Sequence, residues 1–123
     1  MVPVTVTVMA TAAVEPVLML TGNIPATEKA LVHAGLSISD MDVVEVNESF
    51  AGVAVHYQRH FEIPDANYNI NGGAIAMGHA LGATGAVLVN TALDALEESD
   101  GRYGLISICG GAGVASAMVI ERV

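Results

Sequence analysis

A long segment without a polar face constrains the fold of this chain more than any other part of its sequence. From Leu81 to Leu96 small and aliphatic residues follow one another almost without interruption, and acidic side chains appear only at Asp94 and Glu97. A helix that is apolar on all sides is normally buried on all sides. We therefore expect a helix over 81–98 that packs between two sheets, the second of which these residues do not encode. A single layer with an apolar homodimer interface is the alternative.

The other segments alternate between strand and helix patterns and so predict an α/β fold. Period-2 alternation and short apolar runs predict strands, whereas apolar spacings of three and four residues bounded by Pro or Gly predict helices. The predicted strands are 2–8, 43–46, 102–109 and 114–122, with a further strand in the irregular passage 69–77, and the predicted helices are 26–34, 49–61 and 81–98. The order βαβαβαββ predicts one domain, 1–123, in which a mixed five-stranded sheet carries helices on both faces.

Composition and charge exclude several classes of function. Hydrophobic residues make up 53% and charged residues 14% of the chain, which favours a surface partly covered by another domain or subunit. A formal net charge of −9 argues against a nucleic-acid partner, because a phosphate backbone is bound by Lys and Arg. The four basic side chains are scattered: Lys29, Arg59, Arg102 and Arg122.

The cysteine content and the hydropathy pattern bound the compartment. A single cysteine excludes an internal disulfide and a Cys-based zinc site, and it fits a reducing cytosol. Apolar runs fall short of the roughly 20 residues of a membrane helix. We expect a cytoplasmic protein without a metal site or a membrane anchor.

His79 stands just before the apolar segment, with glycines at 78, 82 and 85. Glycines let another group approach the backbone closely, and a helix N-terminus favours a neutral imidazole. A histidine in that setting can take a proton from a thiol or stabilise an oxyanion. The alternative is a histidine that is merely hydrogen-bonded in the core. The histidines without such a context, expected at the surface or on helix faces, are His33, His56 and His60.

Cys109 and Asn47 are the other candidate functional residues. Cys109 ends an apolar strand before the glycine-rich segment 110–113, where sulfur can lie beside free backbone N–H groups. Its alternative is an inert, buried small residue. Asn47 follows the strand 43–46 and precedes a helix, so it could be an N-cap or could hold a water in a pocket. The glycine-rich segments fit neither the P-loop nor the G-x-G-x-x-G spacing of nucleotide-binding motifs.

Three motifs follow one another in a fixed order: N-E-S-F-A at 47–51, N-G-G-A-I-A-M-G-H-A-L-G at 71–82 and C-G-G-A-G at 109–113. With these motifs the chain resembles the C-terminal half of a thiolase over nearly its whole length. Thiolases make or cleave a carbon–carbon bond next to an acyl-CoA thioester. The resemblance implies CoA and acyl-CoA as substrates and no further cofactor.

The resemblance also implies roles for single residues. His79 would activate the nucleophilic cysteine, and Asn47 would hold a water that stabilises the enolate oxygen together with His79. Cys109 would be the acid and base that exchanges the α-proton, and the Gly111 N–H would bind the oxyanion of the tetrahedral intermediate. The residues that would line the pantetheine tunnel are Ser49 and Phe50.

The sequence departs from the family pattern at several positions. Ser49 replaces the usual Ala, Ala80 replaces Pro, and Ala112 and Ala115 replace Gly. The family's nucleophilic cysteine belongs to an N-terminal half that these residues do not include, so we expect activity only with that half, and as partner that half or a second copy. The alternatives are a non-catalytic module that binds acyl-CoA or pairs with thiolases, and slow thioester hydrolysis with Cys109 as nucleophile.

Overall fold

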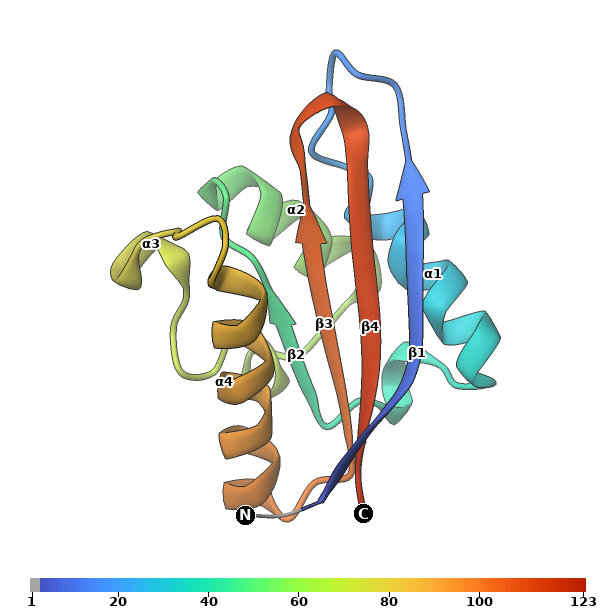
Figure 1. The fold of residues 1–123 in the computed structure, drawn as a ribbon, viewed down its shortest axis with the longest axis vertical. Coiled ribbons are helices and arrows are strands. Elements are labelled where there is room, and N and C mark those ends of the chain that lie inside the picture. The colour runs from blue at the N-terminus through green and yellow to red at the C-terminus, as the bar shows by residue number, and fades with distance from the viewer. Residues whose placement is uncertain (1–2) are drawn as a thin grey trace.

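Four strands form a mixed sheet in the order β1-β4-β3-β2 (Figure 1). The computed structural model describes residues 3–123. The strands are β1 (Val4–Ala13), β2 (Val43–Val46), β3 (Tyr103–Cys109) and β4 (Val114–Arg122). The helices are α1 (Asn23–Ala34), α2 (Ala51–Phe61), α3 (Ala74–Met77) and α4 (Thr84–Ser99), and one-turn 3-10 helices cover 38–40, 65–67 and 111–113.

The strand directions follow from the connections. β3 and β4 form an antiparallel hairpin as predicted, and β1 pairs antiparallel with β4 at the edge of the sheet. β2 and β3 run parallel, joined by a long crossover that includes α4. The hairpin turn needs Gly113, whose φ is +85° and whose added Cβ would lie 2.4 Å from the carbonyl oxygen of Val14.

Helices cover both faces of the sheet, which confirms that part of the prediction. Leu105 and Val119 face a hydrophobic cluster that includes residues of α1 and α2, whereas their neighbours Ile106 and Ile120 face a second cluster built on α4. Adjacent strand residues point to opposite faces, so the two clusters lie on opposite sides of the sheet. In Figure 1, α1 and α4 accordingly lie on either side of the strands.

The predicted fifth strand is absent from the described residues, and the α/β class stands with four. Tyr68 forms a single parallel bridge with Val44, and the ladder stops there. The next residue, Asn69, has a φ of +43°; its backbone N–H still donates to the carbonyl of Val44 at 2.9 Å, and its side chain makes the other bonds to β2. Its Oδ1 accepts the N–H of Val46 at 2.8 Å, and its Nδ2 donates to the carbonyl of Val46 at 3.0 Å. Opposite Val46, an amide side chain thus takes the place of the backbone of a further strand.

Some predicted boundaries differ from the observed ones. The first strand extends to Ala13 because β4 provides a partner along its length, and residue 2 of the predicted range lies outside the described residues. The first helix begins at Asn23, with Pro25 in its first turn. α2 begins at Ala51, and Phe50 stays extended and 64% exposed instead of joining the buried face of the helix.

α4 is not buried on all sides within this chain. Its inner face, with Leu88, Ala92 and Leu96, packs against β2 and β3, whereas Val87 on its outer side is 43% exposed. Beyond α4, the same side of the sheet is uncovered over β1 and β4. There Val6, Met9 and Val114 are 52%, 64% and 54% exposed, and we call these three side chains the open face.

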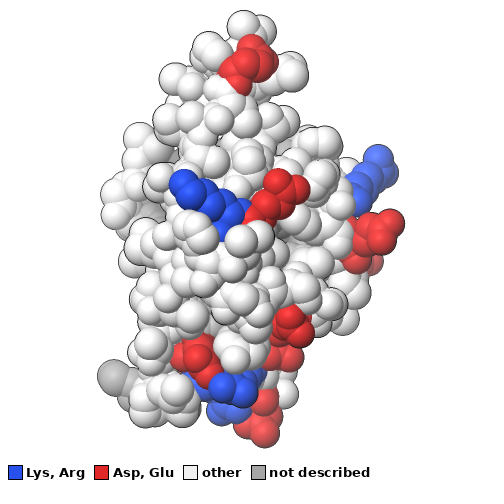
Figure 2. All heavy atoms as spheres, turned by 90° about the vertical axis from the view of Figure 1, so that its right-hand side faces the viewer, with Lys and Arg blue, Asp and Glu red and all other residues white. Residues whose placement is uncertain are grey.

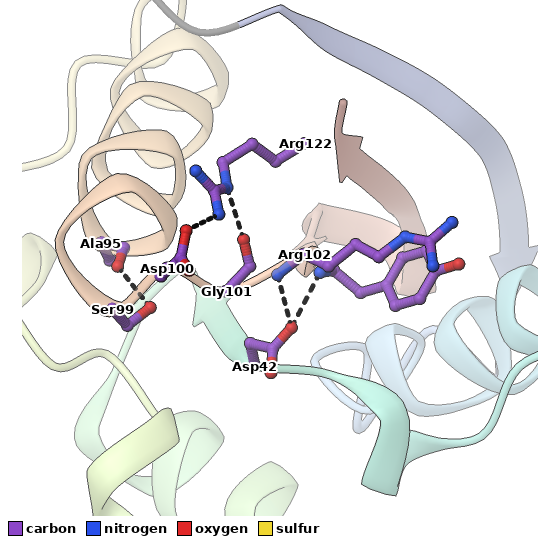
Figure 3. Close-up of polar contacts among 8 residues, drawn as sticks. Asp42, Ala95, Ser99, Asp100, Gly101, Arg102 and Arg122 are labelled. Atoms are coloured by element: carbon purple, nitrogen blue, oxygen red, sulfur yellow. Dashed lines mark hydrogen bonds and ion pairs between the residues drawn. The ribbon is translucent and has the colours of Figure 1, made fainter.

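The end of the sheet where β2 and β3 begin is fixed by polar contacts (Figure 3). One Asp42 oxygen accepts the N–H groups of Arg102 and Tyr103 at 2.7 and 2.9 Å. Arg122, near the end of β4, bonds through Nε to the carbonyl of Gly101 at 2.6 Å and pairs with Asp100. These contacts tie the end of α4 and the starts of two strands together.

Charges are sparse on the side of the molecule that carries β1 and α1. Figure 2 shows acidic and basic side chains there in small separate groups, without a continuous basic patch. Within residues 3–123, no helix is both long enough and apolar enough to cross a membrane. In the same range, no three His, Cys, Asp or Glu side chains gather as a metal site would require.

Candidate functional site

The carboxyl ends of β2 and β3 and the beginning of α4 meet at one end of the sheet. Parallel strands end at the same edge, and a crossover helix runs back, so it begins where the strands finish. Val46 stands opposite Ser107 in the register, which places Asn47 and Cys109 just beyond it. The segment between α3 and α4, in which His79 stands, lies at the same end (Figure 1). Three residues singled out in the sequence therefore share one edge of the sheet.

Asn47 is buried at 1% exposure, and its side chain is only partly satisfied. Its backbone N–H donates to the carbonyl of Ser107 at 3.0 Å, and its Nδ2 donates to Ser49 Oγ at 2.9 Å. Its Oδ1 has no hydrogen-bond partner among the described residues. Asn47 is not an N-cap, because α2 begins after Phe50. A buried amide oxygen without a donor is an available acceptor for a water or a substrate group.

His79 is held by the first residue of α4. Its Nδ1 lies 2.7 Å from Thr84 Oγ1, and that hydroxyl donates its proton to the carbonyl of Ala80 at 3.0 Å. Because the hydroxyl has a single proton, Thr84 accepts from His79, which places the imidazole proton on Nδ1. Nε2 then carries the lone pair and is the nitrogen able to act as a base. The helix predicted to begin at residue 81 begins at Thr84 instead. His79 therefore lies in the loop, five residues before the helix.

One pocket of about 520 Å³ joins the two residues. Asn47 and His79 both line it, together with Thr84 and Leu88 of α4. The pocket lies on the α4 side of β2. The structure thus brings the amide and the imidazole to one space.

Cys109 lies next to this pocket without lining it. The residue is buried at 6% exposure, and Ser49 Oγ lies 3.3 Å from its Sγ. It lines a second cavity of about 640 Å³, bounded by Thr11 and Ala13 of β1 and by Gly110 and Val114. A path of two hydrogen bonds, through Ser49, therefore connects the thiol with the amide of Asn47.

The remaining predicted site residues lie near these two cavities. Gly111 is exposed at the first residue of the one-turn helix after Cys109, where backbone N–H groups lack helical acceptors. Phe50 projects into solvent beside Ser49. The other histidines are exposed, in agreement with the sequence analysis: His33, His56 and His60.

Two supporting residues escaped sequence analysis. Glu48 Oε2 accepts the N–H of Ile75 at 3.1 Å, and its Oε1 accepts from Asn69 Nδ2 at 3.3 Å. Gly73 lies against the same carboxyl, where an added Cβ would come within 2.4 Å of it. Glu48 and Asn69 thereby anchor the loop that leads to His79. The only sequence feature that could have indicated this role was the position of Glu48 directly after Asn47.

Glu45 is a buried acid two residues before Asn47. It is 0% exposed, and neither of its carboxyl oxygens has a partner among residues 3–123. Burial away from water, and to a lesser extent the nearby charge of Glu48, raise the pKa of Glu45 from 4.5 to about 7. The protein around Glu45 therefore favours the neutral form of its carboxyl group.

The arrangement supplies three chemical capabilities at one end of the sheet. An imidazole with a fixed tautomer can take a proton, a buried amide with a free oxygen can hold a water, and a thiol lies beside a glycine turn. Cys109 and His79 line different cavities.

Comparison with known proteins decides the family. The family described as "Thiolase, C-terminal domain" matches residues 2–122. The chain belongs to the thiolase family. It is 53% identical over 110 residues to a steroid 3-ketoacyl-CoA thiolase of Mycobacterium tuberculosis, which covers 89% of this chain and 27% of that protein.

Other thiolases show the same partial coverage. A 3-oxoadipyl-CoA/3-oxo-5,6-dehydrosuberyl-CoA thiolase of Escherichia coli is 51% identical over 117 residues, which are 94% of this chain and 29% of that protein. An acetyl-CoA acetyltransferase of Paracoccus denitrificans is 45% identical over 113 residues, which are 92% of this chain and 29% of that protein. This thiolase chain therefore spans less than a third of the length of these relatives, and it is similar to their C-terminal part.

Proposed function

We propose that this chain contributes Asn47, His79 and Cys109 to a thiolase reaction, acyl transfer between acyl-CoA and CoA with formation or cleavage of a carbon–carbon bond. The observation that carries the proposal is the pocket that Asn47 and His79 both line, together with the unpartnered amide oxygen of Asn47 and the oriented imidazole of His79. Relatives named as thiolases support the class of reaction. The proposed setting is the cytoplasm, and the proposal needs no cofactor besides the CoA substrates.

In this proposal His79 is the base of the acyl-transfer half-reaction. Nε2 takes the proton of a cysteine thiol, the thiolate attacks the thioester carbonyl, and the bond from that carbon to the CoA sulfur breaks to leave an acyl-enzyme. Thr84 keeps Nδ1 protonated, so Nε2 is the nitrogen that passes the proton to the departing CoA thiolate. Asn47 holds a water that, with the imidazole, stabilises the enolate oxygen of the second substrate.

Cys109 serves the carbon–carbon bond step in this proposal. Its thiolate removes the α-proton of the second acyl-CoA in condensation, and its thiol returns a proton to that carbon in thiolysis. The exposed Gly111 N–H binds the oxyanion that forms at the acylated cysteine. Phe50, exposed beside Ser49, contacts the pantetheine arm together with that residue.

The nucleophilic cysteine comes from outside these 123 residues, whose single cysteine is Cys109. The relatives are more than three times as long as the matched segment, and the open face beside α4 is the surface that such an additional domain would cover. A cavity of about 410 Å³ between α4 and β4, lined by Met9, Val89 and Met118, lies at the same place. We therefore propose a thiolase N-terminal half as the partner, with a second copy of this chain as the other candidate.

The test is acetoacetyl-CoA thiolysis by this chain alone and mixed with a separately expressed thiolase N-terminal half. We expect activity in the mixture only, together with a complex on gel filtration. Cys109→Ala and His79→Ala should each lower kcat by about 10²-fold or more, because each removes an acid or base from the reaction. His56→Ala, which removes an exposed histidine of α2, is the matched control and should leave kcat unchanged.

The outcomes separate this proposal from the non-catalytic alternative. Departures at Ala80, Ala112 and Ala115 favour a module that only binds acyl-CoA or pairs with thiolases. A complex that forms but is inactive, or activity that is indifferent to Cys109→Ala and His79→Ala, would establish that alternative. Hydrolysis by the chain alone that is lost in Cys109→Ala would instead assign the thiol as a nucleophile.

A further inference from the structure

We propose that Ser49 is a positioning residue that stabilises the thiolate of Cys109 and orients the amide of Asn47. The inference rests on the proposed function for the use of that thiolate as a base, and on the geometry of this chain for the contact itself. Thiolases commonly have Ala at this position, so the hydroxyl is a feature of this sequence.

The directions of the two hydrogen bonds follow from the chemistry of the groups. The Nδ2 group of Asn47 can only donate hydrogen bonds, so it is the donor in the bond of 2.9 Å to Ser49 Oγ. A thiolate can only accept hydrogen bonds. Ser49 Oγ lies 3.3 Å from Cys109 Sγ, so the hydroxyl must be the donor when the sulfur is charged. The amide N–H donates to the hydroxyl, and the hydroxyl donates to the thiolate.

This arrangement favours the charged form of the sulfur. A hydroxyl that accepts one hydrogen bond becomes a better donor in the next, and bonds to a charged acceptor are stronger than bonds between neutral groups. Cys109 is nearly buried, where water contributes little to the solvation of a charge. The Ser49 hydroxyl is therefore the group in place to donate to the sulfur when it is charged.

The same contact determines how the Asn47 amide is turned. With Nδ2 directed to Ser49, Oδ1 is the atom of the amide that is left without a partner. Ser49 itself is fixed by its own N–H, which donates to the carbonyl of Asn47 at 3.0 Å. One hydroxyl thus couples the amide on the α4 side of β2 to the thiol beside the glycine turn.

The single cysteine makes the inference measurable on this chain, because alkylation by iodoacetamide reports Cys109 alone. The rate is measured by mass spectrometry from about pH 6 to about pH 10. Near pH 7 we expect Ser49→Ala to slow alkylation by about tenfold, the effect of losing one charge-assisted hydrogen bond. At high pH, where both proteins are fully thiolate, the two rates should converge.

The controls separate this role from a structural one. Ser49→Thr keeps the hydroxyl and should retain the native pH profile of alkylation. Ser49→Val introduces a side chain of the same size as Thr without the hydroxyl and should behave like Ser49→Ala. Ser116→Ala removes a half-buried hydroxyl from the cavity of Cys109 without a bond to its sulfur, and should not change the profile.

A rate that is unchanged in Ser49→Ala, or slowed by the same factor at every pH, overturns the proposal. So does a Thr variant that behaves like the Val variant. None of these readouts involves acyl-CoA, so failure here is distinct from failure of the proposed function, which the thiolysis activity of Cys109→Ala tests separately.

Discussion

The two ends of the parallel strand pair β2–β3 differ in how completely their polar groups are bonded. At the end where the strands begin, Asp42 accepts two backbone N–H groups, and Arg122 bonds to Gly101 and Asp100 (Figure 3). At the end where they finish, Asn47 Oδ1 lies buried without a partner among the described residues. The same short strands thus carry one satisfied and one unsatisfied end.

The difference separates stability from function. Hydrogen bonds that satisfy backbone groups at a strand start fix the register and hold α4 to the sheet. A buried acceptor left unsatisfied costs stability, and proteins retain such groups where a ligand or water completes them. We therefore expect substitutions at the first end to change stability without changing the chemistry of the thiol or the imidazole, and substitutions of the side chains at the second end to change that chemistry.

The largest expected effect belongs to Glu45, the unsatisfied acid at the centre of β2. Its pKa is about 7 in the folded chain against an ordinary 4.5, so the folded state binds the proton more tightly than the unfolded state. This tighter binding of the Glu45 proton stabilises the folded state fully below about pH 4.5, and the contribution is lost as the pH rises through about 7. Glu45→Gln should therefore raise the free energy of unfolding by about 3 kcal/mol at about pH 8 and leave it almost unchanged near pH 4.

Urea denaturation at several pH values measures this effect. Glu98→Gln is the matched control, because it neutralises an exposed acid of α4 and should change the pH dependence little. Equal pH dependence in native chain and Glu45→Gln would show that the buried carboxyl is satisfied and would weaken the contrast between the two ends.

The satisfied end provides the second prediction. Asp42→Ala removes the acceptor of two backbone N–H groups and should lower the free energy of unfolding by about 2 kcal/mol. Because the thiol lies at the other end, the rate of Cys109 alkylation should not change. Asp94→Ala, at an exposed position of α4, is the control and should stay within about 0.5 kcal/mol of the native chain. A change of alkylation rate in Asp42→Ala would contradict the separation of the two ends.

The regular parts of this fold were predictable because their signals are local. β4 was predicted with its observed bounds, and the hairpin with β3 follows from the Gly110–Gly113 turn. The error of one strand came from Asn69, whose side chain bonds to both backbone groups of Val46 in place of a strand. Only the folded structure shows that these two residues lie side by side.

The candidate site was predictable as residue types but not as a bonded arrangement. Asn47, His79 and Cys109 were identified from their motifs, and the structure places them at one end of the sheet. The contact of Ser49 with Cys109 joins residues 60 positions apart, so no local pattern could indicate it. Thr84, the hydrogen-bond partner of His79, was only weakly indicated by the sequence, as a threonine near the start of the apolar helix.

Thr84 offers a test within the unsatisfied end. Thr84→Val removes the acceptor of His79 Nδ1 while keeping the shape, so the imidazole loses its fixed tautomer and orientation. We expect kcat for thiolysis in the complex to fall by about tenfold. The free energy of unfolding should change by less than about 1 kcal/mol.

Thr91→Val is a matched control on the same helix. Thr91 also donates to a carbonyl four residues earlier, at 2.9 Å, and lies about two turns along α4 from Thr84. Equal losses of activity in the two variants would assign the effect to the helix rather than to the imidazole, and no loss in either would remove Thr84 from the site.

The smallest expected effect concerns strain beside Cys109. Ala112 has φ +59° and ψ +20°, a left-handed conformation that costs a non-glycine residue about 1 kcal/mol or more. Ala112→Gly relieves that strain but increases the freedom of the unfolded chain, so we expect a net stabilisation of about 0.5 kcal/mol in urea denaturation. Ala86→Gly, at an exposed position of α4, should instead destabilise by about 1 kcal/mol.

Opposite signs in these two variants would place stored strain at the unsatisfied end, next to the glycine turn that carries Gly111. If Ala112→Gly also changed kcat for thiolysis, the strained turn would be part of how the N–H of Gly111 is aimed at the reacting oxygen. A destabilisation in both variants would show that the left-handed turn costs this chain nothing, and the contrast between the two ends would then rest on hydrogen bonding alone.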